Sequence, residues 1–151
     1  MVQNNKLFLV VDANVVGCTH HDPFDSNTFK AVEILGRILR VCHRVVLDIK
    51  EQNEDSILDE YARQARSDLA KKWLIAIQAK ESGKIAFRHR ATVHFSGLSD
   101  PDDEKYLQVA MNSPHKVIIS EDSDLMKIAD HDEIKSQGIR IWGFEEALAK
   151  L

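Results

Sequence analysis

Four acidic residues stand where secondary-structure elements are expected to begin or end, and their carboxylates are suited to binding a divalent cation. They are Asp12, Glu60, Asp103 and Asp122. Asp12 directly follows the apolar run 7–11, and Asp122 comes soon after a second run, 117–119. Such runs are typical of buried parallel strands, and open α/β sheets bind their ligands at the carboxyl ends of those strands. The two aspartates are therefore expected at the same edge of one sheet.

Carboxylates that gather in this way predict a bound metal ion. Two unit charges about 4 Å apart repel by about 4 kcal/mol at an effective dielectric constant of 20. Mg²⁺ and Mn²⁺ favour oxygen ligands, and Mg²⁺ typically binds a few carboxylates together with substrate phosphate. One or two such ions activate a water for attack on a phosphodiester and stabilise the leaving oxygen. The predicted chemistry is therefore metal-dependent phosphodiester hydrolysis.

Asp103 is expected in the first turn of a helix that starts at Asp100-Pro101. Three side chains follow on the same helical face: Tyr106, Leu107 and Ala110. This spacing places the carboxylate at the head of the apolar face, where the helix dipole and free backbone N–H groups stabilise it. The alternative is a capping aspartate, and Asp100 or Asp102 would serve equally well in that role.

Glu60 lies at the border of the apolar face of a helix expected over residues 53–66, so its side chain is expected to reach the strand ends. The alternative is a solvated charge that pairs with Arg63. Glu54 faces the apolar side more directly on helical spacing and is the other candidate for the ligand on this helix.

The remaining candidates also have simpler interpretations. Asp122 suits the cap of a helix that starts at Ser123, and Asp124 is either an auxiliary ligand or an exposed charge. Asp12 suits an Asx turn. Asn14, two residues later, is placed to hydrogen-bond the Asp12 carboxylate and fix its orientation, which is the support that metal-binding acids need.

Strand-like and helix-like segments alternate along the chain. Strands are expected at 7–11, 45–47, 85–87, 117–119 and 139–142. Helices are expected at 29–39 after a cap at Asp25 or Ser26, 53–66, 68–82, 101–111, 123–129 and after Gly143. Residues 12–24, with Gly17, Asp22 and Pro23, are expected as a loop. This alternation predicts an α/β fold with a mostly parallel sheet and helices on both of its faces.

Length and composition predict one soluble domain over residues 1–151. The chain is 44% hydrophobic and 29% charged, and its apolar runs are far shorter than a membrane span. The polar N-terminus leads into a strand without the pattern of a signal peptide, which favours the cytoplasm. Cys18 and Cys42 have no metal-binding spacing and are expected as two reduced, buried thiols.

A net charge of −4 does not by itself favour binding to nucleic acid, but the distribution of charge matters more. Three basic groups are candidates for phosphate contacts: Arg37, Arg40 and Arg44, then Lys71 and Lys72, and then Arg88, His89 and Arg90. The alternative for each is an ordinary solvated face. The chain has no aromatic ladder for stacking bases, so sequence-specific reading of RNA is not expected.

The chain resembles the PIN domain family, metal-dependent nucleases of about this length, over nearly its whole extent. Four segments carry the resemblance: VVDANVV at 10–16, ILDEYAR at 57–63, DEKYLQVA at 103–110 and VIISEDSDL at 117–125. Each is a weak motif alone, but all four occur in the order typical of the family.

The resemblance implies that Asp12, Glu60, Asp103 and Asp122 bind Mg²⁺ or Mn²⁺, with Asn14, Ser120 and Asp124 nearby. It also implies a five-stranded parallel α/β/α sandwich, hydrolysis of RNA and formation of a homodimer. Members of the family include toxins of toxin–antitoxin pairs, whose partner is an inhibitor protein.

We therefore expect a Mg²⁺- or Mn²⁺-dependent endoribonuclease. The first alternative is a PIN-like module that keeps the acids but only binds partners within a larger complex. The second is a phosphatase with Asp12 as covalent nucleophile. That chemistry needs a proton donor, which the related phosphatases supply with a second aspartate two residues later, and here that residue is Asn14.

Overall fold

A parallel sheet of five strands forms the centre of the protein in the computed structural model, which describes residues 6–20, 22, 25–51 and 54–151. Its strands are β1 (Phe8–Val11), β2 (Arg44–Asp48), β3 (Ile85–Arg88), β4 (Val117–Ile119) and β5 (Arg140–Trp142). They lie in the order β3-β2-β1-β4-β5, and every neighbouring pair is parallel. The order changes direction between β1 and β4, which is where ligands of open α/β sheets bind. The predicted parallel sheet is confirmed.

The register of the two central strands brings the ends of β1 and β4 side by side. Val11 pairs with Ile119, and the backbone N–H of Asp12 then donates to the Ile119 carbonyl at 3.0 Å. Residues 9–11 of β1 and 117–119 of β4 are completely buried, as expected for strands covered on both faces, while Phe8 is only partly buried. Asp12 and Ser120 therefore emerge together from the core.

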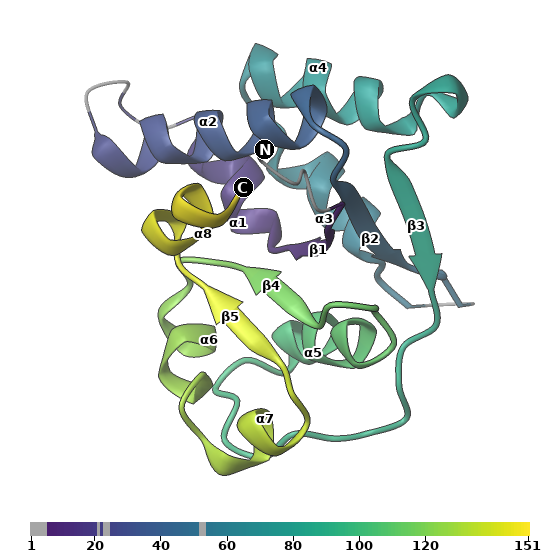
Figure 1. Ribbon diagram of the computed structural model, residues 1–151, viewed down its shortest axis with the longest axis vertical. Coiled ribbons are helices and arrows are strands. Elements are labelled where there is room, and N and C mark those ends of the chain that lie inside the picture. The colour runs from purple at the N-terminus through teal and green to yellow at the C-terminus, as the bar shows by residue number, and fades with distance from the viewer. Residues whose placement is uncertain (1–5, 21, 23–24, 52–53) are drawn as a thin grey trace, which may run out of the picture.

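Helices cover both faces of this sheet. In the described residues they are α1 (Ala13–Cys18), α2 (Ser26–Arg40), α3 (Ile57–Gln64), α4 (Asp68–Gln78), α5 (Glu104–Met111), α6 (Ser123–Ile128), α7 (Asp132–Ser136) and α8 (Phe144–Lys150). Short 3₁₀ turns occur at Lys80–Ser82 and Pro101–Asp103. Figure 1 shows α2, α4 and α8 on one side of the sheet and α5, α6 and α7 on the other, which confirms three α/β/α layers. No helix among the described residues is long and apolar enough to cross a membrane.

Two short helices were not expected from the sequence. Helix α1 occupies part of the predicted loop because the Asp12 side chain caps its first turn, accepting a hydrogen bond from the Asn14 N–H. Helix α7 has only five residues, too few to show a helical period. Pro23, also in the predicted loop, lies outside the described residues.

The predicted burial of both cysteine thiols is wrong. Cys18, the last residue of α1, is only partly buried, and Cys42 is exposed because it lies in the connection between α2 and β2.

Helix α3 begins later than predicted. Ser56 caps it at Ile57, and Ser56 and Asp59 bond to each other's backbone N–H groups in a capping box. Asn53, where the helix was expected to start, lies outside the described residues. Because α3 starts at Ile57, Glu54 precedes the helix and Glu60 lies in its first turn.

Replacing Tyr61 by Phe is expected to lower the free energy of unfolding by about 1 to 3 kcal/mol. The Tyr61 ring is completely buried, and its hydroxyl donates to the Val11 carbonyl at 2.5 Å. Without the hydroxyl, the carbonyl at the end of β1 loses this partner inside the core. Urea denaturation measures the change, and an unchanged midpoint and slope would contradict the expectation.

Candidate metal centre

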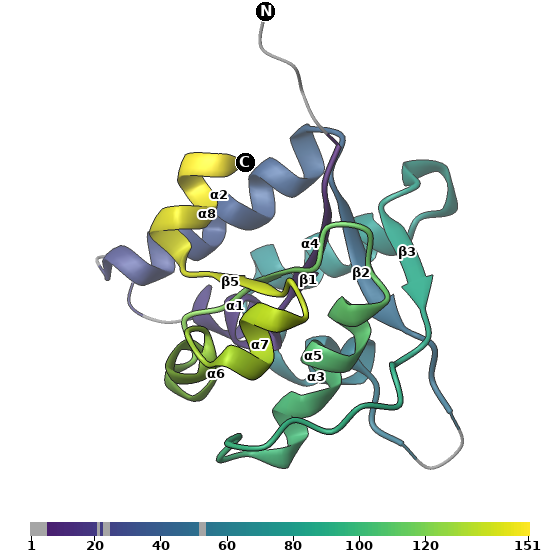
Figure 2. The same cartoon turned by 60° about the horizontal axis from the view of Figure 1, so that its bottom comes forward.

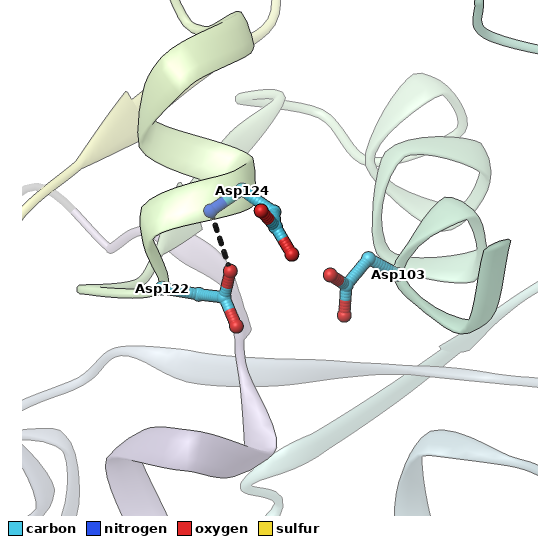
Figure 3. Close-up of side chains that lie close together, drawn as sticks. All are labelled: Asp103, Asp122 and Asp124. Carbon is cyan, nitrogen blue, oxygen red and sulfur yellow. Dashed lines mark hydrogen bonds between the residues drawn. The ribbon is translucent and has the colours of Figure 1, made fainter. Parts of the chain in front are cut away.

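Three carboxylates meet at the carboxyl edge of the sheet. Asp103, Asp122 and Asp124 each present one oxygen, and these three oxygens lie within 4.8 Å of one another. Asp103 ends the 3₁₀ turn before α5, Asp122 follows β4, and Asp124 lies in the first turn of α6. Figure 3 shows the three side chains pointing toward one another across the space between these two helices.

The spacing and chemistry of these oxygens fit a small divalent cation. Opposite ligands of Mg²⁺ are about 4.2 Å apart and neighbouring ones about 3 Å, so a bound ion would draw the oxygens slightly closer. Without a cation, two unit charges at this separation repel by about 3 kcal/mol at an effective dielectric constant of 20. Among the residues that the structure describes, the group consists of three carboxylates without cysteine or histidine, a set of ligands that favours Mg²⁺ or Mn²⁺.

Hydrogen bonds hold Asp122 in place. Its side chain caps α6 by accepting the Asp124 N–H at 2.8 Å, and its own N–H donates to the Ser120 hydroxyl oxygen at 2.9 Å. Ser120 in turn donates its hydroxyl to Asp12 Oδ2 at 2.7 Å. Asp122 is therefore a helix cap and a member of the carboxylate group at once, and Ser120 joins it to Asp12.

Asp12 lies directly behind the three carboxylates. The residue is 4% exposed, and Asp12 Oδ1 accepts the Asn14 N–H at 3.2 Å. Burial raises the pKa of Asp12 to about 6, and the negative charges of Asp122 and Glu60 add to this effect. Within the described part of the chain, the buried Asn14 Oδ1 has no hydrogen-bond partner. This unused acceptor beside Asp12 fits a site that binds a further ligand.

Asp103 has the most perturbed carboxyl group of the site. Its side chain makes no capping bond, since Asp100 takes that role by accepting the Asp102 N–H at 3.0 Å. Burial raises the pKa of Asp103 to about 7, and the charges of Asp12 and Asp122 contribute further. A bound divalent cation acts in the opposite direction and favours the ionised carboxylate.

Glu60 is held by two neighbours from α5. The Lys105 ammonium and the Tyr106 hydroxyl both donate to its carboxylate. Lys105 is itself buried, at 6% exposed. Glu60 is close enough to raise the pKa of Asp12 and Asp103, whereas Glu54 pairs with Arg90 at 3.1 Å. Of the two glutamates considered from the sequence, Glu60 is thus the one beside the carboxylate group.

The three basic residues at positions 88–90 have different contacts and do not lie together. Arg90 binds the buried carboxylate of Asp48 at 2.6 Å, so its charge is already matched. The Arg88 guanidinium lies over the Phe8 ring, at the start of β1 and away from the carboxylates. His89 is exposed. The three side chains therefore do not form a single phosphate-binding site next to the carboxylates.

Two features of this edge were missed in the sequence. Asp48 ends β2 much as Asp12 follows β1, so the rule that identified Asp12 would also have found Asp48. Lys105 carries no comparable signal, because a lysine in the first turns of a helix is usually exposed. Its burial depends on the packing of α5 against Glu60 of α3.

The metal-free protein is expected to lose stability as the pH rises from about 4 to about 7. Asp12 and Asp103 have pKa values raised from 3.8 to about 6 and about 7, so the folded protein binds these protons more tightly than the unfolded chain does. Their contribution to stability is full below about pH 4 and is lost as the pH passes through the two raised values. The lowered pKa of Asp59, about 2, acts below this window. Burial lowers the pKa of His43, and this shift opposes part of the loss because it favours the folded protein as the pH rises.

Thermal unfolding in EDTA at a series of pH values measures this loss. Asp103→Asn removes the group with the larger shift and is expected to flatten the profile. A wild-type midpoint that rises steadily across the window would contradict the expectation.

In comparisons with protein-family models, curated proteins and solved structures, none matched this chain.

Proposed function

We propose that this protein is a divalent-metal-dependent endoribonuclease of the PIN type that hydrolyses RNA phosphodiester bonds. The observation that carries the proposal is the convergence of Asp103, Asp122 and Asp124 at the switch point of the sheet. The three residues come from two segments of the chain that are far apart in sequence. Such a group of like charges in a partly buried place is typical of a cation site.

Each residue has a defined part in this proposal. Asp103, Asp122 and Asp124 hold Mg²⁺ or Mn²⁺, and Ser120 with Asp12 fixes the position of Asp122 from behind. When bound, the ion lowers the pKa of a water and neutralises charge on the phosphodiester. Asn14 offers a further oxygen at the same edge, since its Oδ1 has no partner among the described residues.

A cleavage assay tests the proposal. Wild-type protein is expected to cut a labelled single-stranded RNA with Mn²⁺ or Mg²⁺ and to be inactive in EDTA, and Asp122→Asn is expected to abolish cutting. Asparagine also caps helices, so this variant keeps the Asp124 hydrogen bond and the fold. Asp25→Asn is the matched control, because Asp25 caps α2 by the same kind of hydrogen bond and does not belong to the carboxylate group. Equal activity of the Asp122 variant and this control would contradict the assignment.

A second candidate is a PIN-like binding module without catalytic activity, and the surroundings of Glu60 favour it. Lys105 and Tyr106 satisfy this carboxylate, which leaves it less available to an ion. Metal binding without cleavage of any RNA would support this candidate over the nuclease.

Further properties belong to the same proposal and follow from the PIN resemblance. They are a role as the toxin of a toxin–antitoxin pair, an inhibitor protein as partner and a homodimer. A cytoplasmic location is proposed on a different ground, the polar N-terminus without the pattern of a signal peptide.

A further inference from the structure

A basic residue stands at or just before the start of every strand in the described sheet. These residues are Lys6, Arg44, Lys84, Lys116 and Arg140. Because all five strands are parallel, the residues lie along the amino edge of the sheet, opposite to the carboxylates. Figure 2 shows β1, β2 and β3 starting at the upper edge of the molecule and running downward. The sheet is therefore basic at one edge and acidic at the other.

Several of these cations gather round one aromatic ring. The Lys6 Nζ lies 5.5 Å from the centroid of the Phe8 ring, the Arg44 Cζ 5.8 Å and the Arg88 Cζ 5.7 Å. The His115 ring stacks on the same ring, with centroids 5.9 Å apart. Arg140 extends the group, because its guanidinium donates to the His115 carbonyl at 3.4 Å. We call this group the basic edge: Lys6, Phe8, Arg44, Arg88, His115 and Arg140. Arg88 differs from the others because it is the last residue of β3, and only its side chain reaches back to the Phe8 ring.

The charges of the basic edge are not matched by carboxylates. Within the described part of the chain, Lys6, Arg44, Arg88 and Arg140 form no ion pair, in contrast to the arginines that bind Glu33 or Asp48. Lys84 and Lys116 differ from them, since their ammonium groups bind backbone carbonyls at the ends of helices. Like charges repel, so gathering four cations without a counter-ion costs energy unless an anion binds there.

His115 adds a neutral donor. Its Nδ1 accepts the Phe8 N–H at 3.1 Å, so in the neutral ring the proton is on Nε2. The basic edge thus offers guanidinium, ammonium and imidazole N–H donors beside an aromatic ring. Guanidinium groups match phosphate geometry, and aromatic rings stack on unpaired bases.

We propose that the basic edge binds the phosphate backbone of single-stranded RNA, at a site distinct from the carboxylates. Along β1, Phe8 is four residues from Asp12, which corresponds to about 13 Å of strand. An anionic membrane is the weaker candidate, because Phe87, next to Arg88 in β3, is the one exposed large apolar side chain of the described residues that adjoins the basic edge in sequence. Binding of RNA at the basic edge requires no metal ion, so it is expected even if the carboxylates do not support cleavage.

Fluorescence anisotropy in EDTA with a labelled oligouridine tests this inference without cleavage. Arg44→Gln/Arg88→Gln is expected to bind about tenfold more weakly than wild type at low salt. The slope of log K against log salt is expected to fall by about 1.4, since each single-strand phosphate contact contributes about 0.7. Arg63→Gln/Arg66→Gln is the matched control, which removes the same charge at two exposed positions that are not among the candidates for phosphate contacts, and it is expected to bind like wild type. Thermal melting confirms that each variant folds, and Arg88→Gln/Arg140→Gln repeats the test if Arg44 proves necessary for folding.

Three results would overturn the inference. The first is wild-type protein that does not bind oligouridine, and the second is an equal loss of affinity in the two double variants. The third is binding to phosphatidylserine vesicles that depends on Arg44 and Arg88 while RNA binding does not. Because the assay contains no metal and measures binding alone, its result does not depend on cleavage, and the nuclease proposal is tested separately by the cleavage assay.

Discussion

Asp103→Asn is expected to slow metal-dependent RNA cleavage by about 100-fold or more. A bound metal ion lowers the activation barrier by several kcal/mol, and each 1.4 kcal/mol of barrier changes the rate by about a factor of ten. The substitution removes one of the three carboxylates whose oxygens converge within 4.8 Å. It also removes a partly buried carboxyl whose pKa is raised to about 7, so the metal-free variant is expected to unfold at a higher temperature than wild type above pH 7. Loss of activity together with a gain in stability separates a role in metal binding from a role in folding.

Asp102→Asn is the control for this prediction. Asp102 is the preceding residue on the same 3₁₀ turn, is exposed and does not belong to the carboxylate group. Gel assays with Mn²⁺ and melting curves in EDTA are measured on both variants and on wild type. If the two variants lose activity equally, or if Asp103→Asn melts earlier in EDTA above pH 7, Asp103 is not the metal ligand proposed here.

Arg90→Met is expected to lower the free energy of unfolding by about 3 to 5 kcal/mol, because it leaves a buried charge without its partner. The Asp48 side chain is 0% exposed and binds Arg90 at 2.6 Å. Asp48 also accepts the Ile57 N–H at 2.8 Å, so it fixes the start of α3, the helix that carries Glu60. The loss of Arg90 therefore weakens the packing of α3 against β2 as well as the ion pair.

Two further variants define this effect. Glu54→Gln removes the other, half-exposed partner of Arg90 and is expected to cost less than about 1 kcal/mol. Asp48→Asn/Arg90→Met removes both charges of the buried pair and is expected to recover part of the lost stability. Urea denaturation measures all three variants, and a cost for Arg90→Met as small as that of Glu54→Gln would show that the buried pair is not important for stability.

The sequence predicts the sheet well because its strands are nearly continuous apolar runs. Residues 117–119, for example, are all apolar and form a completely buried strand. Every strand that was expected is present. Helix α1 was missed because its start depends on a single side-chain hydrogen bond from Asp12 to the Asn14 N–H. Such a cap is indistinguishable in sequence from an Asx turn.

The sequence identifies each acid at the carboxyl edge as a candidate ligand, but it does not show which of them lie together in the folded protein. Asp122 was identified as a ligand from its position after a strand. For Asp124 the sequence was consistent both with an auxiliary ligand and with an exposed charge. Its place in the group depends on the angle at which α6 leaves β4, which no local pattern encodes. Conversely, Glu60 was predicted to bind the ion, and in the structure its carboxylate accepts hydrogen bonds from Lys105 and Tyr106. That outcome depends on the packing of α3 against α5.

Diffraction from crystals soaked in Mn²⁺, with data collected to locate manganese by anomalous scattering, tests the central claim most directly. The account predicts a manganese peak about 2.2 Å from one oxygen each of Asp103, Asp122 and Asp124. The peak is expected to be absent in crystals of Asp103→Asn. An empty space between these three carboxylates at saturating Mn²⁺, or a peak that persists unchanged in the variant, would contradict it.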